Sequence, residues 1–204
     1  VVASAARHVH PSIVGLLDYS AVVGGCVSCS TIQGARLAGV TPSGNMPHSL
    51  ILLIGDTVRA VESFDKHMPQ EVPRVALVDT FKDEAEEALR VAGSLRERLR
   101  GIRVDTPPER GGVSADMVAE LRSRLDQSGF RHVEIFVSGA FDPDKIAHFV
   151  NSSAPVNGFA VGSYISSASP NDFTADIHEI DGQAIAKRGR VPGITPSPRL
   201  DRVM

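Results

Sequence analysis

Two turns in the second half of the chain have the residue types that bind phosphate. The first, SGA at Ser138–Ala140, follows an apolar run and precedes an expected helix, because Asp142 is a typical N-cap and Pro143 suits the first helical position. The second, AVGS at Ala160–Ser163, ends another short strand. Backbone N–H groups and a helix dipole favour a bound phosphate at such turns. We therefore expect a phosphate site; the alternative is two packing turns, since glycine turns also occur without ligands.

Carboxylates end two other apolar runs. Asp79 and Asp105 continue a series with Ser138 and Gly162 at intervals of about 24 to 33 residues, the period of a strand followed by a helix. In barrels and doubly wound sheets, the carboxyl ends of parallel strands carry the chemistry. On the residues alone, both aspartates can also be caps or solvated turns.

The elements that must position these residues follow from caps and apolar spacing. Helices are expected over residues 10–23, 31–38, from Asp56 onward, 85–99, 114–128 and 142–150. In the first, the apolar stripe consists of Ile13, Leu16, Leu17 and Val23. A charged cluster is interpreted as a solvated helix face; it contains Glu84, Glu86, Glu87 and Arg96.

The predicted fold class is α/β. Six or seven short strands precede residue 170, whereas a closed eight-stranded barrel usually takes about 250 residues. We therefore expect an economical or incomplete TIM-like barrel over residues 1–170. Beyond it, Asp181-Gly182 is the strongest short hairpin signal, so residues 171–204 are predicted to form a hairpin and an extended tail, packed on or beside the barrel.

Composition excludes several classes of protein. The 204 residues are 42% hydrophobic and 22% charged, with a net charge of −3 and no basic stripe for nucleic acid. No apolar run approaches the roughly 20 residues that span a bilayer, so we expect a soluble, cytoplasmic protein without a membrane partner. The apolar start at Val1 suggests a cut inside a larger gene product. Cys26 and Cys29 are one pair, whereas structural zinc needs about four ligands, so buried reduced thiols are the default over a redox or metal role.

Six phrases occur in an order that goes beyond periodicity. They are GNMPHSL at 44–50, LVDTFKDE at 77–84, RVDTP at 103–107, IFVSGA at 135–140, AVGS at 160–163 and FTAD at 173–176. Together they resemble the nicotinate phosphoribosyltransferases, closest to their shorter prokaryotic branch, from Arg7 to about Arg199. The resemblance implies an α/β barrel of the nicotinate/quinolinate phosphoribosyltransferase class, here without the N-terminal sandwich domain that in the family helps to form the active site across a dimer.

The resemblance also implies an activity. In the family, nicotinate and phosphoribosyl pyrophosphate give nicotinate mononucleotide and pyrophosphate in NAD biosynthesis and salvage, with Mg²⁺ as cofactor and ATP as co-substrate. Nicotinate and a related pyridine both stay open as substrate. The expected partners are these small molecules and either a second copy of the chain or a subunit that carries the missing domain.

Site residues carry over position by position. His48 matches the phosphorylated histidine, Arg7 faces pyrophosphate, and Arg103 lies close to the pyridine and ribose. Asp79 and Asp105 can face ribose hydroxyls, magnesium or the positive charge that develops on the anomeric carbon, and no residue is assigned as a dedicated metal ligand. Further substrate-binding positions are Thr80 and, for the 5-phosphate, Ser138, Gly139, Ala140, Ala160, Val161, Gly162 and Ser163.

Some positions depart from the family pattern. Ala140 and Ala160 stand where glycine is usual, which alanine tolerates if its φ is negative. Val27 replaces an Asp, and His8 replaces an Arg. These departures keep a second hypothesis open: a non-catalytic phosphate- or nucleotide-binding relative, or a subunit that needs a partner chain. A different barrel enzyme acting on a sugar phosphate is a third.

Overall fold

The computed structural model describes residues 1–44 and 46–198, so Asn45 of the first family phrase and the end of the predicted tail lie outside the described residues. The chain divides into two compact units, Val1–Ala168 and Ser169–Met204. No helix of the described residues is long and apolar enough to cross a membrane.

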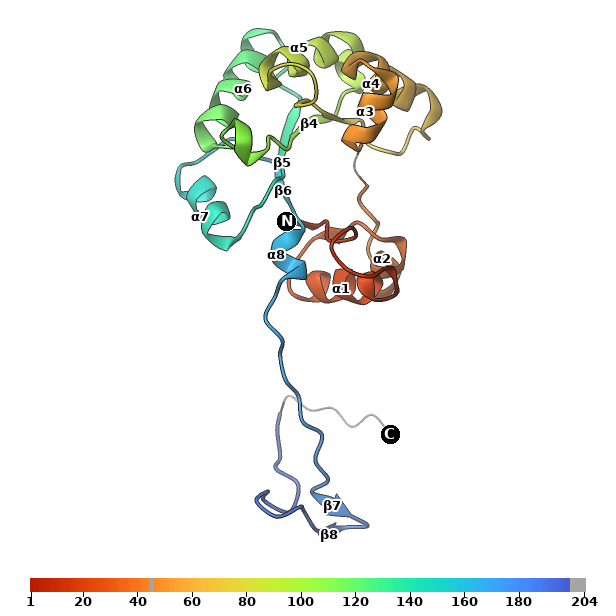
Figure 1. Ribbon diagram of the computed structural model, residues 1–204, viewed down its shortest axis with the longest axis vertical. Helices are drawn as coiled ribbons and strands as arrows, with labels where there is room; N and C mark the ends of the chain where they lie inside the picture. Colours follow the sequence, from red (N-terminus) through yellow and green to blue (C-terminus); the bar gives the residue numbers. More distant parts are fainter. Residues whose placement is uncertain (45, 199–204) are drawn as a thin grey trace. The chain divides into compact units, whose positions relative to one another are not determined.

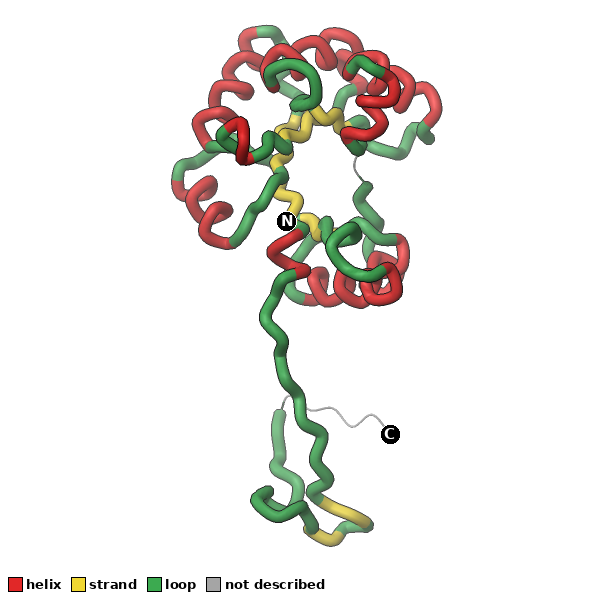
Figure 2. The backbone as a smooth tube through the Cα atoms, in the orientation of Figure 1, coloured by secondary structure: helices red, strands yellow, loops and turns green. Residues whose placement is uncertain are grey.

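The first unit is built on a six-stranded parallel sheet (Figure 1). Its strands are β1 (Val2–Ala3), β2 (Ser28–Cys29), β3 (Val75–Leu77), β4 (Gly101–Val104), β5 (Glu134–Val137) and β6 (Gly158–Val161). Their order is β2-β1-β6-β5-β4-β3, which leaves β2 and β3 as edges within the part of the chain that is described. Figure 2 shows the strands on the inner side of an arc and the helices outside it. The predicted incomplete TIM-like barrel is confirmed.

Eight α-helices are present in the described residues. They are α1 (Pro11–Val23), α2 (Ile32–Ala38), α3 (His48–Ile54), α4 (Thr57–His67), α5 (Glu84–Leu95), α6 (Ala115–Gln127), α7 (Pro143–Asn151) and α8 (Ser163–Ser166). Short 3₁₀ turns follow at Arg96–Arg98 and Pro108–Arg110. The predicted caps are confirmed, because the side chains of Asp56, Ser114 and Asp142 each accept a backbone N–H three residues further on.

The main core lies between the sheet and helices α4 to α7. Ile102, Val104, Ile135 and Val137 face this layer and are buried. The inner side of the arc differs, because the Phe136 ring fills space that a Cβ at Gly101 or Gly158 would occupy, with ring atoms 2.8 and 3.0 Å from those positions. The two glycines therefore allow one aromatic ring to spread across three strands.

The apolar stripe predicted on α1 does not form a buried face of that helix. Leu16 is 60% exposed, and Ile13 and Val23 are exposed as well. Instead Asp18 is buried and accepts a hydrogen bond from the Thr31 N–H at 2.8 Å, at the start of α2. This polar contact to a helix N-terminus thus joins α1 to α2, beside a small apolar cluster that contains Ala21, Val22 and Ala35.

The solvated face predicted for the cluster on α5 is also wrong in part. Glu84 and Glu87 are buried, and Glu87 has no exposed surface. Glu84 Oε1 accepts a hydrogen bond from Thr106 Oγ1 at 2.6 Å, and Arg90 Nη1 lies 3.6 Å from Glu87 Oε1. Neighbouring segments that are distant in the sequence cover this side of α5, which helical spacing alone does not reveal.

Cys29 is buried, Cys26 is half-buried, and both are free thiols. Burial is the main cause that raises the pKa of each thiol. In the second unit, β7 (Glu179–Ile180) and β8 (Gln183–Ala184) form an antiparallel hairpin around Asp181-Gly182, both with positive φ. The hairpin is confirmed, and its strands are shorter than the alternating pattern suggests.

Candidate functional site

The carboxyl ends of β3, β4 and β5 bring the predicted polar residues together. In the sheet, Leu77 pairs with Arg103, and Arg103 pairs with Phe136. Alternate residues of a strand share a face. Asp79, Asp105 and Ser138 each follow two residues after these partners, so they continue along the inner side of the arc.

Arg103 is the centre of this cluster. Its Nη1 donates to Asp105 Oδ2 at 3.3 Å and to Ser138 Oγ at 3.0 Å, and its Nη2 donates to the Met46 carbonyl at 3.0 Å. The side chain is only 11% exposed, and this burial lowers the pKa of Arg103, while the charges of Asp105 and Asp79 partly offset the effect. The bond to Met46 also fixes the segment that leads into α3.

His48 is the first residue of α3 and meets Asp79. Its Nε2 lies 3.1 Å from Asp79 Oδ1, with the histidine side chain 38% exposed and the aspartate side chain 1% exposed. A carboxylate is an acceptor only, so this contact assigns the proton to Nε2. With the proton on Nε2, the Nδ1 atom of His48 carries the ring lone pair, and no hydrogen bond to it occurs among the described residues.

Asp79 and Thr80 carry polar atoms without partners. Asp79 Oδ2 and Thr80 Oγ1 are buried, and no hydrogen-bond partner for either occurs among the described residues. A buried carboxylate oxygen without a donor is costly, so Asp79 Oδ2, which lies beside the other predicted site residues, is a candidate ligand-binding atom. Because carboxylates and substrate phosphates together hold Mg²⁺ in many sites, Asp79 and Asp105 fit that ion. The described residues contain no group of three or more His, Cys, Asp or Glu that could hold a metal by themselves.

The first predicted phosphate turn follows β5. Ser138 has no free donor, because its N–H and its hydroxyl both donate to the Val104 carbonyl, at 2.9 and 3.2 Å. The N–H groups of Gly139 and Ala140 have no acceptor among the described residues. Gly139 has φ 94° and lies against β4, since a Cβ there would be 3.2 Å from Asp105 Oδ1. Ala140 has φ 50°, so the negative φ under which alanine replaces glycine without strain is not met.

The second predicted turn follows β6 beside the end of β1. Ala160 and Val161 are strand residues, and the Val161 carbonyl accepts the Ser4 N–H at 2.7 Å. Gly162 approaches β1 closely, since a Cβ there would be 2.4 Å from the Ser4 carbonyl and 3.0 Å from His8 Nε2. Ser163 begins α8. This turn therefore adjoins the segment that carries His8 and Arg7, and the charge of Arg7 acts on Arg103.

The structure thus brings together His48, Asp79, Arg103, Asp105, Ser138 and Gly139. Arg7 is exposed and makes no side-chain hydrogen bond to a described residue. Sequence reasoning missed Lys145, whose Nζ contacts the Gly139 carbonyl at 3.4 Å. Its position could have indicated this contact, because Lys145 lies three residues after Asp142, the N-cap that follows the turn.

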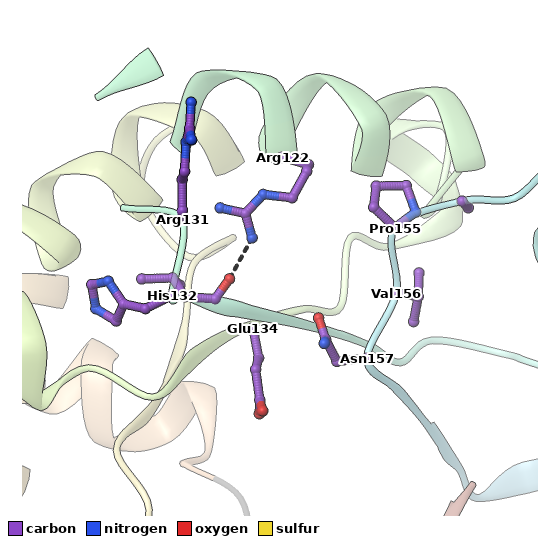
Figure 3. A pocket seen from close by; sticks show the side chains of 9 residues that line it. Arg122, Arg131, His132, Glu134, Pro155, Val156 and Asn157 are labelled. Carbon is purple, nitrogen blue, oxygen red and sulfur yellow. Dashed lines mark hydrogen bonds between the residues drawn. The ribbon is translucent and has the colours of Figure 1, made fainter. Parts of the chain in front are cut away.

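Two hollows lie at the opposite end of the sheet. One, of about 280 Å³, is lined by residues that precede β5 and β6, including Arg122, Glu134 and Asn157 (Figure 3). Another, of about 880 Å³, is lined by residues from α4, α5 and the approaches to β3 and β4. Neither contains a residue of the cluster around Arg103. We favour that cluster as the site because the predicted catalytic residues His48, Asp79 and Asp105 converge on it.

Residues 1–176 match the family model described as quinolinate phosphoribosyl transferase, C-terminal domain. A nicotinate phosphoribosyltransferase of Mycobacterium tuberculosis is 29% identical over 143 residues, which are 69% of this chain and 30% of that protein.

Two solved structures extend the comparison. A nicotinate-nucleotide pyrophosphorylase from Pyrococcus furiosus superposes with a TM-score of 0.83 and 44% identity over 95% of this chain and 49% of that chain. Human nicotinic acid phosphoribosyltransferase shares the fold, with a TM-score of 0.55 and 18% identity over 79% of this chain and 43% of that one. The chain spans about half the length of these solved relatives and 30% of the curated relative.

Proposed function

The chain belongs to the quinolinate phosphoribosyl transferase family, because its residues 1–176 match the C-terminal domain of that family, and we propose that it forms the barrel part of a nicotinate phosphoribosyltransferase. The proposed reaction transfers the phosphoribosyl group of phosphoribosyl pyrophosphate to nicotinate and releases pyrophosphate, with ATP hydrolysis, in NAD biosynthesis or salvage. The names of the Mycobacterium and Pyrococcus relatives support a nicotinate substrate. A related pyridine is the alternative that substrate competition would test.

One observation carries the proposal: Asp79 is buried, holds His48 through one oxygen, and has no partner for the other among residues 1–44 and 46–198. The carboxylate fixes the proton on His48 Nε2, which leaves Nδ1 as the nucleophile that accepts the phosphoryl group of ATP. The negative charge also stabilises the imidazolium character that develops as Nδ1 forms its new bond. The orphaned Asp79 Oδ2 is then the atom that faces the substrate.

Arg103 and Asp105 act on the transfer itself. The Asp105 carboxylate, held by Arg103, is oriented in advance to stabilise positive charge on the anomeric carbon as pyrophosphate leaves. The exposed Arg7 supplies a guanidinium for pyrophosphate. Mg²⁺, when bound by Asp79, Asp105 and substrate phosphates, would neutralise the charge of the leaving group. The free N–H groups of Gly139 and Ala140 would hold the sugar phosphate, and those of Gly162 and Ser163 are the second set of candidates.

The experiment is product formation by this chain from nicotinate, phosphoribosyl pyrophosphate and Mg²⁺, with and without ATP. We expect His48→Ala to abolish the stimulation by ATP while ATP-independent transfer continues, because only the phosphoryl acceptor is removed. His67→Ala is the matched control, since His67 is exposed at the end of α4 and bonds only its own helix. Undiminished ATP stimulation in His48→Ala would refute the role of His48.

A second candidate is a relative or subunit that binds phosphate without turnover on its own. It is favoured by the positive φ of Ala140 at the predicted phosphate turn. Titration of phosphoribosyl pyrophosphate separates the two: binding without product supports the second candidate, and no binding contradicts both. With this second candidate we also propose that the chain associates with a second copy of itself or with another subunit that completes the site. Size-exclusion chromatography tests this by the apparent mass of the protein. The cytoplasmic location stays a prediction.

A further inference from the structure

Lys145 is a cation beside the phosphate turn that the proposed function does not use. It lies in the first turn of α7, and its Nζ contacts the Gly139 carbonyl at 3.4 Å. The ammonium also lies 4.3 Å from the centre of the Phe141 ring. That ring is buried and packs edge to face against Phe149 and Phe159, with centroids 5.2 and 5.3 Å away. The ring is therefore a rigid support that holds the ammonium against the turn.

The peptide that Lys145 contacts has a defined direction. The Gly139–Ala140 bond is trans, as are the other peptide bonds of the described residues. In a trans peptide, the carbonyl oxygen and the following N–H point in opposite directions. Because the Gly139 carbonyl faces Lys145, the Ala140 N–H faces away from it. This N–H is one of the two in the turn without an acceptor among the described residues.

The same peptide direction is unfavourable for Ala140. A φ of 50° brings an L-residue into the left-handed region, where Cβ crowds the following carbonyl. Rotation of the Gly139–Ala140 peptide by half a turn would carry Ala140 to a negative, extended φ and relieve this strain. This rotation changes ψ of Gly139 at its φ of 94°, and glycine permits it because it has no Cβ. A contact must therefore hold the peptide in the observed direction.

We propose that Lys145 is a positioning residue that holds the Gly139–Ala140 peptide in its strained direction, so that the Ala140 N–H stays available to a phosphate oxygen. The inference rests on the proposed phosphate site. Lys145 acts on the peptide carbonyl rather than on the ligand, because it lies on the carbonyl side. Burial lowers the pKa of Lys145, and the neighbouring Asp142 partly offsets this shift.

A double-mutant cycle tests this role. The probe is inorganic phosphate, followed by phosphoribosyl pyrophosphate with Mg²⁺, titrated into the wild type, Lys145→Met, Ala140→Gly and the double variant. We expect Lys145→Met to weaken binding about five- to thirtyfold, the equivalent of the left-handed strain that it releases. In the double variant we expect most of the affinity to return, because glycine at 140 has no strain to relieve. Lys66→Met, at an exposed position of α4, is the control.

The outcomes separate the possible roles. Weakening that Ala140→Gly does not rescue would overturn the positioning role and make Lys145 a plain source of charge. Unchanged binding in Lys145→Met, with a wild type that binds phosphate, would also overturn it and leave the proposed function intact.

A wild type that binds neither probe would contradict the proposed function instead. In that case the role of Lys145 is tested in the free protein by NMR. The three-bond coupling between the amide and α protons of Ala140 reports its φ. A changed coupling in Lys145→Met supports the role, and an unchanged coupling overturns it.

Discussion

The two ends of the sheet contain similar residue types but use them differently. At the carboxyl ends of the strands, Asp79 Oδ2, Thr80 Oγ1 and the N–H groups of Gly139 and Ala140 have no partners among the described residues. At the opposite end, where the two hollows lie, two arginines are each paired with several acceptors of the fold. Arg74 alone donates to the carboxylate and carbonyl of Asp65 and to three further carbonyls, those of Pro69, Val72 and Met68.

Arg122 repeats this pattern at the smaller hollow. Its Nε donates to Asp126 at 2.8 Å, and its terminal nitrogens donate to the carbonyls of Phe130 and Val133. The dashed line in Figure 3 marks the bond to Val133. These arginines fasten the segments that lead into the strands. The carboxyl ends of the strands thus keep polar atoms without partners among the described residues, whereas these two arginines are engaged in holding the fold.

The largest effect on stability is expected at Arg74. Replacement of this buried arginine by methionine should lower the free energy of unfolding by about 3–5 kcal/mol, because Asp65 and several carbonyls lose their donors. Arg98→Met is the matched control: Arg98 pairs with the same aspartate but is exposed, so less than about 1 kcal/mol is expected. Urea denaturation measures both. Equal losses of unfolding free energy in the two variants would show that Arg74 contributes no more than an exposed ion pair does.

Asp79→Asn should affect function rather than stability. The neutral amide costs less to bury, so the free energy of unfolding should change by less than about 1 kcal/mol. The affinity for phosphoribosyl pyrophosphate with Mg²⁺, or the rate of transfer, should fall about 10²- to 10³-fold, as for other groups that stabilise charge in a site. Asp116→Asn, in the exposed first turn of α6, should change neither. A large loss of stability in Asp79→Asn would show that Asp79 has a structural role, like Arg74 and Arg122 at the opposite end of the sheet.

Gly139→Ala and Gly55→Ala separate backbone strain from close approach. Both glycines have positive φ, 94° and 84°, so each substitution should lower stability by about 1–2 kcal/mol. A Cβ at 55 meets nothing within 4 Å, whereas one at 139 meets Asp105 Oδ1 at 3.2 Å. Only Gly139→Ala should therefore weaken phosphate binding as well. Equal binding by the two variants would remove the turn after β5 from the site.

The smallest effect is expected for a partly exposed ion pair of the helical layer. Asp56 Oδ2 accepts a hydrogen bond from Arg90 at 2.7 Å, the main cause that holds the pKa of Asp56 below its ordinary value of 3.8. Its stabilisation is thus present above pH 3.8 and is lost as pH falls through the lower folded pKa. We expect less than about 1 kcal/mol. Urea unfolding of wild type and Asp56→Asn across this range should show a weaker acid dependence in the variant, and parallel curves would contradict it.

Local signals in the sequence predict much of the fold. The caps at Asp56, Ser114 and Asp142 and the hairpin at Asp181-Gly182 depend on neighbours within a few residues, so their prediction succeeds. The strand ends likewise indicate where the polar cluster must gather.

Features that depend on long-range contacts escape the sequence. His48 meets Asp79 across 31 positions, and Arg103 reaches the Met46 carbonyl across 57. The burial of Asp18 and Glu87 depends on neighbouring helices, and the φ of Ala140 depends on which way one peptide faces. Helical periodicity and turn composition carry no information on any of these.

The position of β1 in the sheet has a consequence for synthesis of the chain. β1 pairs with β6, so Val2 cannot meet Ala160 until the last strand of the sheet has left the ribosome. At the usual pace of about 5–20 residues per second, this interval is on the order of 10 s or more. During it, the apolar Val1–Ala3 segment can pair only with β2. Such non-local closure slows folding, and until it occurs the open strand edge can pair with another chain.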